Sequence, residues 1–310
     1  MQSSYRGVGL SVLASALFGV MYYYSAQLAP LDGEQIFGWR MLLTAPLMLA
    51  LLRVRGDLGL LRNTTSRLRS EPILWLVLPV SAVLLGLQLW IFLWAPPNGR
   101  ALEVSLGYFM LPLTMVLAGR LLYGERLTPW QGLAVLSATL GVLHELWRVG
   151  SFSWAAAIVA LGYPMYFVLR RRFRTDHLGG LCLDMLLMLP VAAWFAWIAG
   201  PDLRVYLQRP ALGLLIPGLG LLSMAALAAY IAASRALPLG LFGLLGYVEP
   251  VLLVGVALLL GERMAAEQWW TYGPIWAAVV VLVGEGLRKS HANASGKQLR
   301  QDPTARAGAA

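Results

Sequence analysis

The stretch A-L-F-G-V-M-Y-Y at residues 16–23 decides the fold, because a similar stretch, A-L-G-Y-P-M-Y-F, returns at residues 160–167. The next apolar segment repeats in the same way: R-M-L-L-T-A-P at 40–46 is answered by D-M-L-L-M-L-P at 184–190. Both pairs are separated by 144 residues. Leucine-rich segments align easily by chance, so a single match would carry little weight, whereas matches in a constant order indicate an internal repeat.

Two later matches extend this repeat at a nearly constant spacing. Pro79 and Pro112 are answered by Pro217 and Pro250 at a spacing of 138, and G-E-R recurs at 124–126 and 261–263. If each copy contains five membrane spans, an odd number, the second copy must cross the membrane in the opposite direction. Inverted repeats of this kind are typical of secondary transporters.

The composition is that of a membrane protein. With 59% hydrophobic and 13% charged residues, the chain has too little polar surface to cover a soluble globule of 310 residues. The net charge of +9 does not indicate nucleic acid binding, because the basic residues cluster between apolar stretches. Its single cysteine, Cys182, excludes an internal disulfide and a thiolate metal cluster, and we expect no cofactor.

We predict an all-α membrane protein with ten transmembrane helices, each long enough for the roughly 20 residues that a bilayer requires. The first copy occupies residues 1–150 and the second 151–287, followed by a disordered tail at 288–310. The expected spans are 7–28, 35–52, 72–94, 101–122, 129–147, 152–170, 178–199, 211–233, 240–260 and 266–287.

The distribution of Lys and Arg predicts the orientation. With the N-terminus inside, the inner segments hold 18 of these residues and the outer segments hold five. Positive residues accumulate on the cytoplasmic side of membrane proteins. We therefore expect both termini to lie in the cytoplasm.

Several motifs resemble the RarD branch of the EamA transporters, within the drug/metabolite transporter superfamily. The resemblance extends from about residue 6 to residue 287. It implies two EamA repeats, ten helices, a bacterial inner-membrane location and the transport of small molecules, but it fixes no binding residues. The matching motifs include E-V-S-L-G-Y-F-M-L-P-L at 103–113, L-L-Y-G-E-R at 121–126, W-I-F-L-W-A at 90–95 and G-Y-V-E-P at 246–250.

Ionisable residues within a bilayer are costly and are therefore candidates for function. Arg40 and Glu103 carry opposite charges at similar depths below the outer face. We expect them to pair, either as a structural lock between two helices or as the outer end of a substrate site. These two interpretations are about equally favoured, because buried ion pairs often serve packing alone.

Glu249 is the leading candidate for coupling transport to protons. It falls about ten residues into the ninth span, close to the midplane, and Pro250 follows it. Since proline has no N–H, it interrupts the helical hydrogen bonds there. A carboxyl group at a broken helix near the midplane can load and release a proton, although a permanently protonated structural residue is the alternative.

The other candidates are weaker. We expect Asp184 to pair with a cytoplasmic arginine such as Arg170 or Arg171 in a structural role. Tyr108 and Tyr247 occupy matching spans and could form flat walls for an amphipathic substrate. The acidic residues of the two G-E-R turns are expected to cap helix ends.

The sequence thus predicts a secondary transporter that moves a small amphipathic metabolite or drug by alternating access, with a proton as the expected coupling ion. An enzyme is disfavoured, because the three histidines form no metal motif and no nucleophile motif is present. A membrane receptor or scaffold that transports nothing is the alternative. The substrate, the direction of transport and the oligomeric state are not encoded in these patterns.

Overall fold

The computed structural model describes residues 2–95, 100–150, 153–198, 203–252 and 266–301, and within these ranges the chain forms helices and no β-strand. The first half contains α1 (Gln2–Ala26), α2 (Gly33–Val54), α3 (Leu58–Ser70), α4 (Leu74–Trp94), α5 (Ala101–Tyr123) and α6 (Pro129–Val149). The second half contains α7 (Trp154–Arg172), α8 (Leu178–Ala193) with the π-helical turn η1 (Trp194–Ile198), α9 (Leu203–Gln208), α10 (Leu212–Ala236), α11 (Leu239–Leu245), the 3₁₀ turn η2 (Ala266–Gln268) and α13 (Trp269–Gln301).

Six of these helices are both long and apolar enough to cross a membrane, so the chain is a multi-pass membrane protein. They cover Tyr5–Ser25, Gly33–Val54, Leu74–Trp94, Glu103–Tyr123, Leu178–Trp197 and Leu212–Ala236. Helices are also present at the other four expected spans, although the ninth expected span, 240–260, lies partly outside the described residues. The structure adds two short helices that the sequence analysis does not predict, α3 and α9.

Local sequence signals explain where several helices begin and end. α2 begins at a capping box in which Asp32 and Gln35 satisfy each other's backbone N–H groups, and Thr128 and Gln131 form the same arrangement before α6. α5 ends at Gly124, whose φ of +63° is readily adopted only by glycine. The capping boxes satisfy N–H groups that would otherwise remain unpaired where a helix begins, and the N–H of Gly124 donates to the carbonyl of Gly119 where α5 ends.

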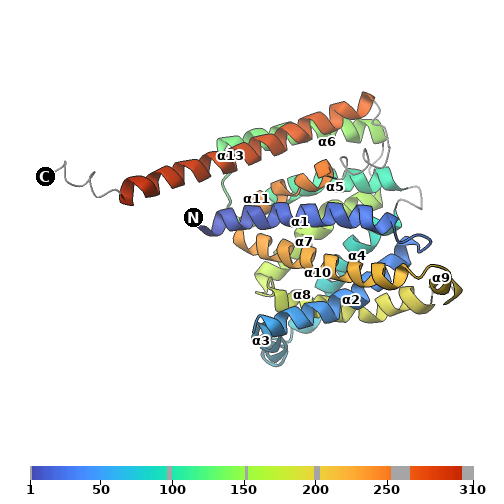
Figure 1. The fold of residues 1–310 in the computed structure, drawn as a ribbon. Coiled ribbons are helices and arrows are strands. Elements are labelled where there is room, and N and C mark those ends of the chain that lie inside the picture. The colour runs from blue at the N-terminus through green and yellow to red at the C-terminus, as the bar shows by residue number, and fades with distance from the viewer. Residues whose placement is uncertain (1, 96–99, 151–152, 199–202, 253–265, 302–310) are drawn as a thin grey trace.

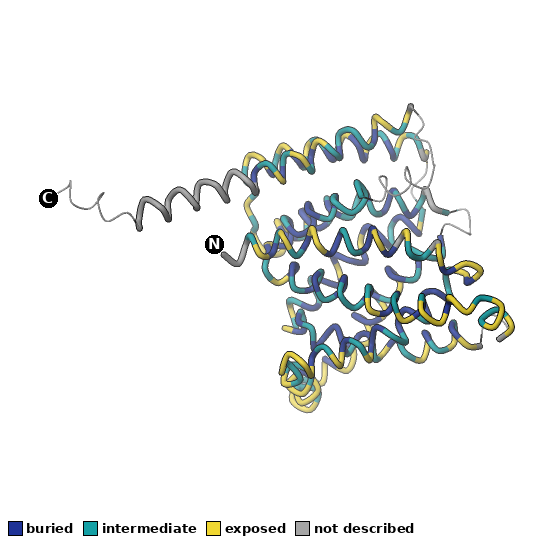
Figure 2. The backbone as a smooth tube through the Cα atoms, viewed as in Figure 1, coloured by how far each residue is buried: buried dark blue, intermediate teal, exposed yellow. Residues whose placement is uncertain are grey.

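The helices form a bundle in which most elements run side by side, with α6 and α13 together along one edge (Figure 1). Buried residues concentrate on the helix faces that meet inside the bundle (Figure 2). Helices approach closely where α11 crosses α5: a Cβ atom added at Gly243 would lie 2.3 Å from the Cβ of Met115. The glycine-rich ninth span therefore serves close helix packing, as small residues commonly do in membranes.

Helices at matching positions in the two halves contact one another. α2 packs against α8, α5 against α11, and α6 against α13. At the crossing of α5 and α11, the Tyr247 hydroxyl donates a 2.8 Å hydrogen bond to the carbonyl of Phe109, and these residues are 138 apart in the chain. This separation equals the spacing of Pro112 and Pro250, so equivalent positions of the two halves meet there.

α3 lies at the end of the bundle where α7 ends. The Arg67 guanidinium donates hydrogen bonds to the carbonyls of Phe173 and Arg174, at 2.8 and 3.3 Å. Two arginine-rich segments, 53–69 and 170–174, are thereby joined at one end of the molecule.

α13 is longer than the predicted tenth span. It continues to Gln301, so residues 288–301, which we expect to be disordered, are helical. Extending a formed helix adds a hydrogen bond for each residue that it fixes, which favours continuation even through a polar sequence.

Candidate functional site

The ninth span is interrupted next to Glu249. α11 ends at Leu245, a turn covers 246–247, and the helix resumes at 248–252. The backbone N–H of Glu249 donates to the carbonyl of Gly246 at 3.2 Å, a three-residue spacing instead of the four-residue spacing of an α-helix. Pro250 has no N–H to restore the regular pattern. The helix is thus interrupted at 246–247, directly before Glu249.

Residues from four other helices lie near Glu249. Arg40 on α2, Tyr108 on α5, Tyr163 on α7 and Tyr230 on α10 are all close enough to interact with it electrostatically. Glu249 is only partly buried. The Glu249 site, as we call these five residues, therefore combines opposite charges with aromatic hydroxyl groups and includes three of the candidates from the sequence: Glu249, Arg40 and Tyr108.

Arg40 enters this site as a buried cation with spare hydrogen-bond donors. Its side chain is 2% exposed, and its Nε donates a 2.8 Å hydrogen bond to the Ser223 hydroxyl on α10. Within the described residues, Nη2 is buried without a hydrogen-bond partner, and no ion pair joins Arg40 to Glu249. A buried guanidinium without a direct carboxylate partner is energetically costly. The arrangement could bind a polar or anionic group of a ligand.

Aromatic rings form the walls around these charges. Tyr230 packs edge-on against Phe18 and Tyr163, with ring centroids 5.7 and 6.1 Å apart, and lies 4.8 Å from Phe242. The Tyr108 ring meets Phe92 edge-on at 5.7 Å. These flat surfaces with hydroxyl groups suit an amphipathic ligand.

Ser223, Tyr163 and Tyr230 are not among the site residues predicted from the sequence. For Tyr230 a signal exists, because it lies 138 residues after Phe92, the spacing that relates Pro112 to Pro250. An aromatic residue at the same position of both halves could have marked it. No comparable sequence signal marks Ser223, since the matching position 85 is a leucine.

The expected ion pair between Arg40 and Glu103 does not form, and this prediction is wrong. Glu103 lies in the first turn of α5 and pairs with Arg100, three residues earlier, at 3.1 Å. Arg40 instead contacts Ser223 and lies near Glu249. The two side chains therefore have different partners, Arg100 for Glu103 and Ser223 for Arg40.

Asp184 pairs with Arg170, one of the two arginines predicted for it. It is fully buried and also accepts hydrogen bonds from the Ser81 hydroxyl at 2.5 Å and the Tyr166 hydroxyl at 3.0 Å. Arg170 donates further bonds to the carbonyls of Thr175 and His177. This network joins α4, α7 and α8 and separates Asp184 from the Glu249 site.

Tyr247 also lies apart from Arg40 and Tyr108. It is fully buried with Phe109 and residues of α6 and α13, and its hydroxyl is satisfied by the Phe109 carbonyl. Of the two tyrosines expected from the sequence, Tyr108 lies near Arg40 and Glu249, whereas Tyr247 packs between α5 and α11.

Glu125 of the first G-E-R turn caps a helix, as predicted. Its two carboxylate oxygens accept the backbone N–H groups of Leu239 and Gly240, at 2.6 and 2.7 Å, at the start of α11. Arg171 lies 4.0 Å from the same carboxylate and donates to the carbonyls of Ser234 and Leu237. The half-helix that leads to Glu249 is thus fixed at its beginning. The second G-E-R turn lies outside the described residues.

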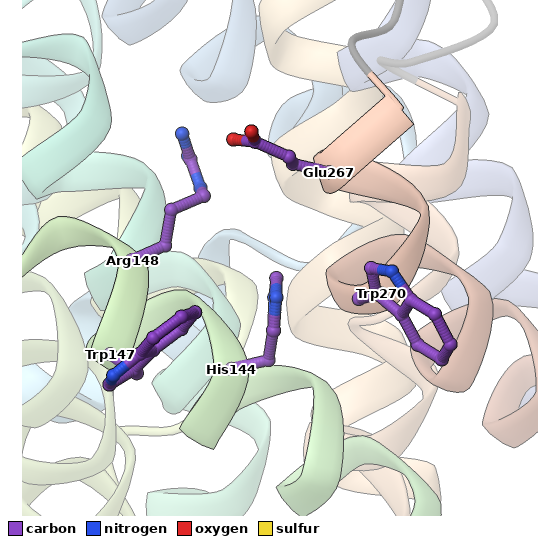
Figure 3. A pocket seen from close by; sticks show the side chains of 5 residues that line it. All are labelled: His144, Trp147, Arg148, Glu267 and Trp270. Atoms are coloured by element: carbon purple, nitrogen blue, oxygen red, sulfur yellow. The ribbon is translucent and has the colours of Figure 1, made fainter.

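A separate pocket of about 650 Å³ lies between the adjoining ends of α6 and α13 (Figure 3). Its lining residues are His144, Trp147, Arg148, Glu267 and Trp270. Nowhere in the described ranges do three His, Cys, Asp or Glu side chains gather as metal ligands would.

The sequence of this chain resembles those of known transporters. The sequence profile of the EamA-like transporter family matches residues 5–144. The chloramphenicol-sensitive protein RarD of Pseudomonas aeruginosa is 48% identical over 93% of this chain and 97% of its own length. An uncharacterized transporter of Pasteurella multocida is 40% identical over 91% of this chain and 97% of its own, and Protein RarD of Escherichia coli is 29% identical over 91% and 95%.

A solved crystal structure shares the fold. It covers 89% of this chain and 96% of its own, with a TM-score of 0.64 and 19% sequence identity. At this level of identity the similarity concerns the arrangement of the helices alone.

Proposed function

Since this chain belongs to the EamA-like transporter family and to its RarD branch, we propose that it is a secondary transporter that moves a small amphipathic metabolite or drug across the bacterial inner membrane. The Glu249 site carries this proposal. It joins a buried guanidinium with spare donors, a carboxylate beside a broken helix, and tyrosine walls from three helices. Transporters commonly place their binding sites at such interrupted helices near the midplane.

Alternating access would follow from two inverted five-helix repeats. Contacts between matching helices, α2 with α8, α5 with α11 and α6 with α13, support a pseudo-two-fold axis in the membrane plane. The bond between Tyr247 and the carbonyl of Phe109 would lie on this axis. In this arrangement the two halves rock against each other and expose the Glu249 site to one side of the membrane at a time.

We propose that the protein is oriented in the membrane with both termini in the cytoplasm. Arg67 on α3 bonds to the carbonyls of residues 173 and 174, so two segments rich in arginine lie at the same end of the bundle. Such a concentration of positive charge favours the cytoplasmic side.

A proton is the coupling ion that we propose, with Glu249 as the group that carries it. Water access to a carboxyl group strongly affects its proton affinity. A site that opens first to one side and then to the other would therefore load and release a proton in step with the transport cycle. Arg40 would bind a polar or anionic part of the substrate through its spare Nη2 donors.

Flux through the reconstituted protein is the test. A screen for thermal stabilisation of the purified chain by antibiotics, amino acids and metabolites first identifies ligands, since a ligand that binds only the folded state raises the melting temperature. Chloramphenicol is included because a relative is named for sensitivity to it. A stabilising ligand should then cross the membrane of proteoliposomes faster than in protein-free vesicles. Binding without any flux would favour the alternative of a receptor or scaffold.

A further inference from the structure

The pocket between α6 and α13 shares no residue with the Glu249 site. Arg148 and Trp147 belong to the last turns of α6, while Glu267 and Trp270 belong to the turn and helix start on the opposite side. In Figure 3 the Glu267 carboxylate points toward the side of the pocket on which Arg148 lies, and His144 stands below both side chains. The pocket therefore presents a positive and a negative group on facing sides.

In and beside the pocket, carboxylate side chains outnumber guanidinium side chains. Arg148 pairs with both carboxylate oxygens of Glu145: one accepts a 3.1 Å hydrogen bond from Nε and the other accepts a bond from Nη2, which leaves Nη1 for a ligand. Glu145 is buried and also accepts a 2.8 Å bond from the Thr271 hydroxyl. Glu267 is exposed, and no ion pair is formed by it within the parts of the chain that the structure describes. Two carboxylates thus accompany one guanidinium, which disfavours a ligand that is purely anionic.

The surroundings are those of a membrane–water interface. Trp147 and Trp270 are 80% and 71% exposed, and tryptophan is enriched where the apolar core of a bilayer meets the headgroups. Below Trp147, an exposed apolar ridge descends along α6 with alternating spacings of three and four residues, which places its members on one helix face. The residues of this ridge are Leu133, Leu136, Leu140 and Leu143.

We propose that this pocket binds the headgroup of a zwitterionic phospholipid that carries a primary ammonium group, as in phosphatidylethanolamine. The phosphate lies against Arg148, the ammonium group donates to the Glu267 carboxylate, and the acyl chains extend along the leucine ridge. The guanidinium and the carboxylate match these two headgroup charges in sign. This proposal requires only that the chain spans a membrane and does not depend on transport.

The geometry favours a primary over a quaternary ammonium group. In Figure 3 the two indole rings stand on opposite sides of the pocket and do not enclose its centre, so they form no aromatic cage of the kind that binds choline. The negative site is a carboxylate, which accepts hydrogen bonds from a primary ammonium and none from a trimethylated one.

Native mass spectrometry of the purified, delipidated full chain tests this proposal. Phosphatidylethanolamine, phosphatidylcholine and phosphatidylglycerol with identical acyl chains are titrated separately. We expect phosphatidylethanolamine to be retained best, and Glu267→Gln to weaken its binding about five- to tenfold, which is less than the loss of a buried charged hydrogen bond would cause because Glu267 is exposed. Binding of phosphatidylglycerol should change little in this variant.

Asp57→Asn is the matched control, because it removes a half-buried carboxylate that pairs with Arg55 at 2.9 Å and lies outside the pocket. Arg148→Gln should weaken all three lipids, but it strands the buried Glu145 carboxylate, so Glu267→Gln is the deciding variant. Equal retention of phosphatidylglycerol and phosphatidylethanolamine by the unmodified chain, or an unchanged preference in Glu267→Gln, would overturn the proposal. Because no substrate or gradient is used, the result is independent of the proposed transport function.

Discussion

Two opposite charges, Arg40 and Glu249, lie near each other inside an apolar bundle without forming a direct ion pair. Leaving charged groups imperfectly paired in a membrane interior is costly, and such residues usually take part in ligand or ion movement. Each side chain therefore has a separate expected task, Arg40 in binding the substrate and Glu249 in carrying a proton.

Replacing Glu249 with glutamine keeps the shape of the side chain but removes its ability to ionise. We expect Glu249→Gln to abolish uptake driven by a pH gradient in proteoliposomes while substrate exchange at equal pH continues. Glu71→Gln, which removes a carboxylate paired with Arg67 on the surface, is the control and should leave both rates unchanged. Gradient-driven uptake by Glu249→Gln at the rate of the unmodified protein would show that Glu249 is structural.

The buried pair of Arg170 and Asp184 should be strongly coupled in stability. Arg170→Ala or Asp184→Ala alone leaves one buried charge unpaired and should cost about 3–5 kcal/mol, whereas the double variant should cost much less than the sum. Unfolding in detergent measures these changes. The corresponding cycle for Arg40 and Glu103, which do not contact each other, should be additive within about 0.5 kcal/mol, and marked coupling there would contradict the observed geometry.

His177 should make stability depend on pH. Burial, assisted by nearby Arg170, lowers the pKa of this imidazole from 6.5 to about 4 in the folded protein. The unfolded chain binds the proton at the ordinary pKa, so stability should fall as the pH drops from about 6.5 toward about 4. Above pH 6.5 both states are neutral and the contribution stays constant.

A change to asparagine isolates this effect. The Nδ1 atom of His177 accepts the backbone N–H of Gly180 at the start of α8, and asparagine can cap a helix in the same way without titrating. The melting temperature of His177→Asn should therefore decline less than that of the unmodified chain between pH 6.5 and 4. Identical declines would rule out His177 as the cause.

Among the contacts expected from the sequence, the pairing of Asp184 with Arg170 is confirmed, because charge type suggests an arginine as the partner of a buried carboxylate. Counting along the spans gives an expected depth for Arg40, Glu103 and Glu249, but it does not give the direction of each side chain. The count contains no information on how each helix is rotated about its axis or tilted against its neighbours. Arg40 and Glu103 were therefore expected to meet, and the contact of Arg40 with Ser223 was not expected.

At the scale of single helices, the cap on α11 connects a turn between two spans to the Glu249 site. Glu125→Ala removes the acceptor for the N–H groups of Leu239 and Gly240 and should cost about 1 kcal/mol, as loss of a helix cap commonly does. Hydrogen exchange should become faster at these two amides, while amides of α4 remain protected. Unchanged exchange at 239 and 240 would show that the cap contributes no local stability.

Helices were predictable where apolar length and breaking residues coincide. Pro250 marked the interruption of the ninth span, which the structure places at 246–247. α3 was missed because it is a polar, 13-residue helix whose stability comes from contacts such as those of Arg67 with the carbonyls of Phe173 and Arg174. Such tertiary contacts lie more than 100 residues apart in the chain and leave no local pattern.

At the scale of the whole molecule, the proposed orientation places α9 outside and α3 inside. In a Cys182→Ala background, Gln208→Cys should react with a membrane-impermeant maleimide in right-side-out vesicles, because Gln208 is exposed at the end of α9. Arg69→Cys, exposed on α3, should react only in inverted vesicles. The reverse pattern would refute the orientation, and labelling of both positions from one side would refute the predicted number of crossings between them.

The contact between Arg40 and Ser223 also has a consequence for biosynthesis. These residues are separated by 183 positions, so a ribosome adding about 5–20 residues per second makes Ser223 roughly 10–40 s after Arg40. Throughout that interval, the nascent chain must shelter a guanidinium whose eventual neighbours on α10 and beside Glu249 do not yet exist. Arg170 and Asp184, made within about 3 s of each other, can neutralise their charges inside a single newly inserted hairpin. The charged side chain on the early helix α2 therefore depends on water, lipid headgroups or the insertion machinery for longer than the charged side chains on α7 and α8, which soon find partners within the protein.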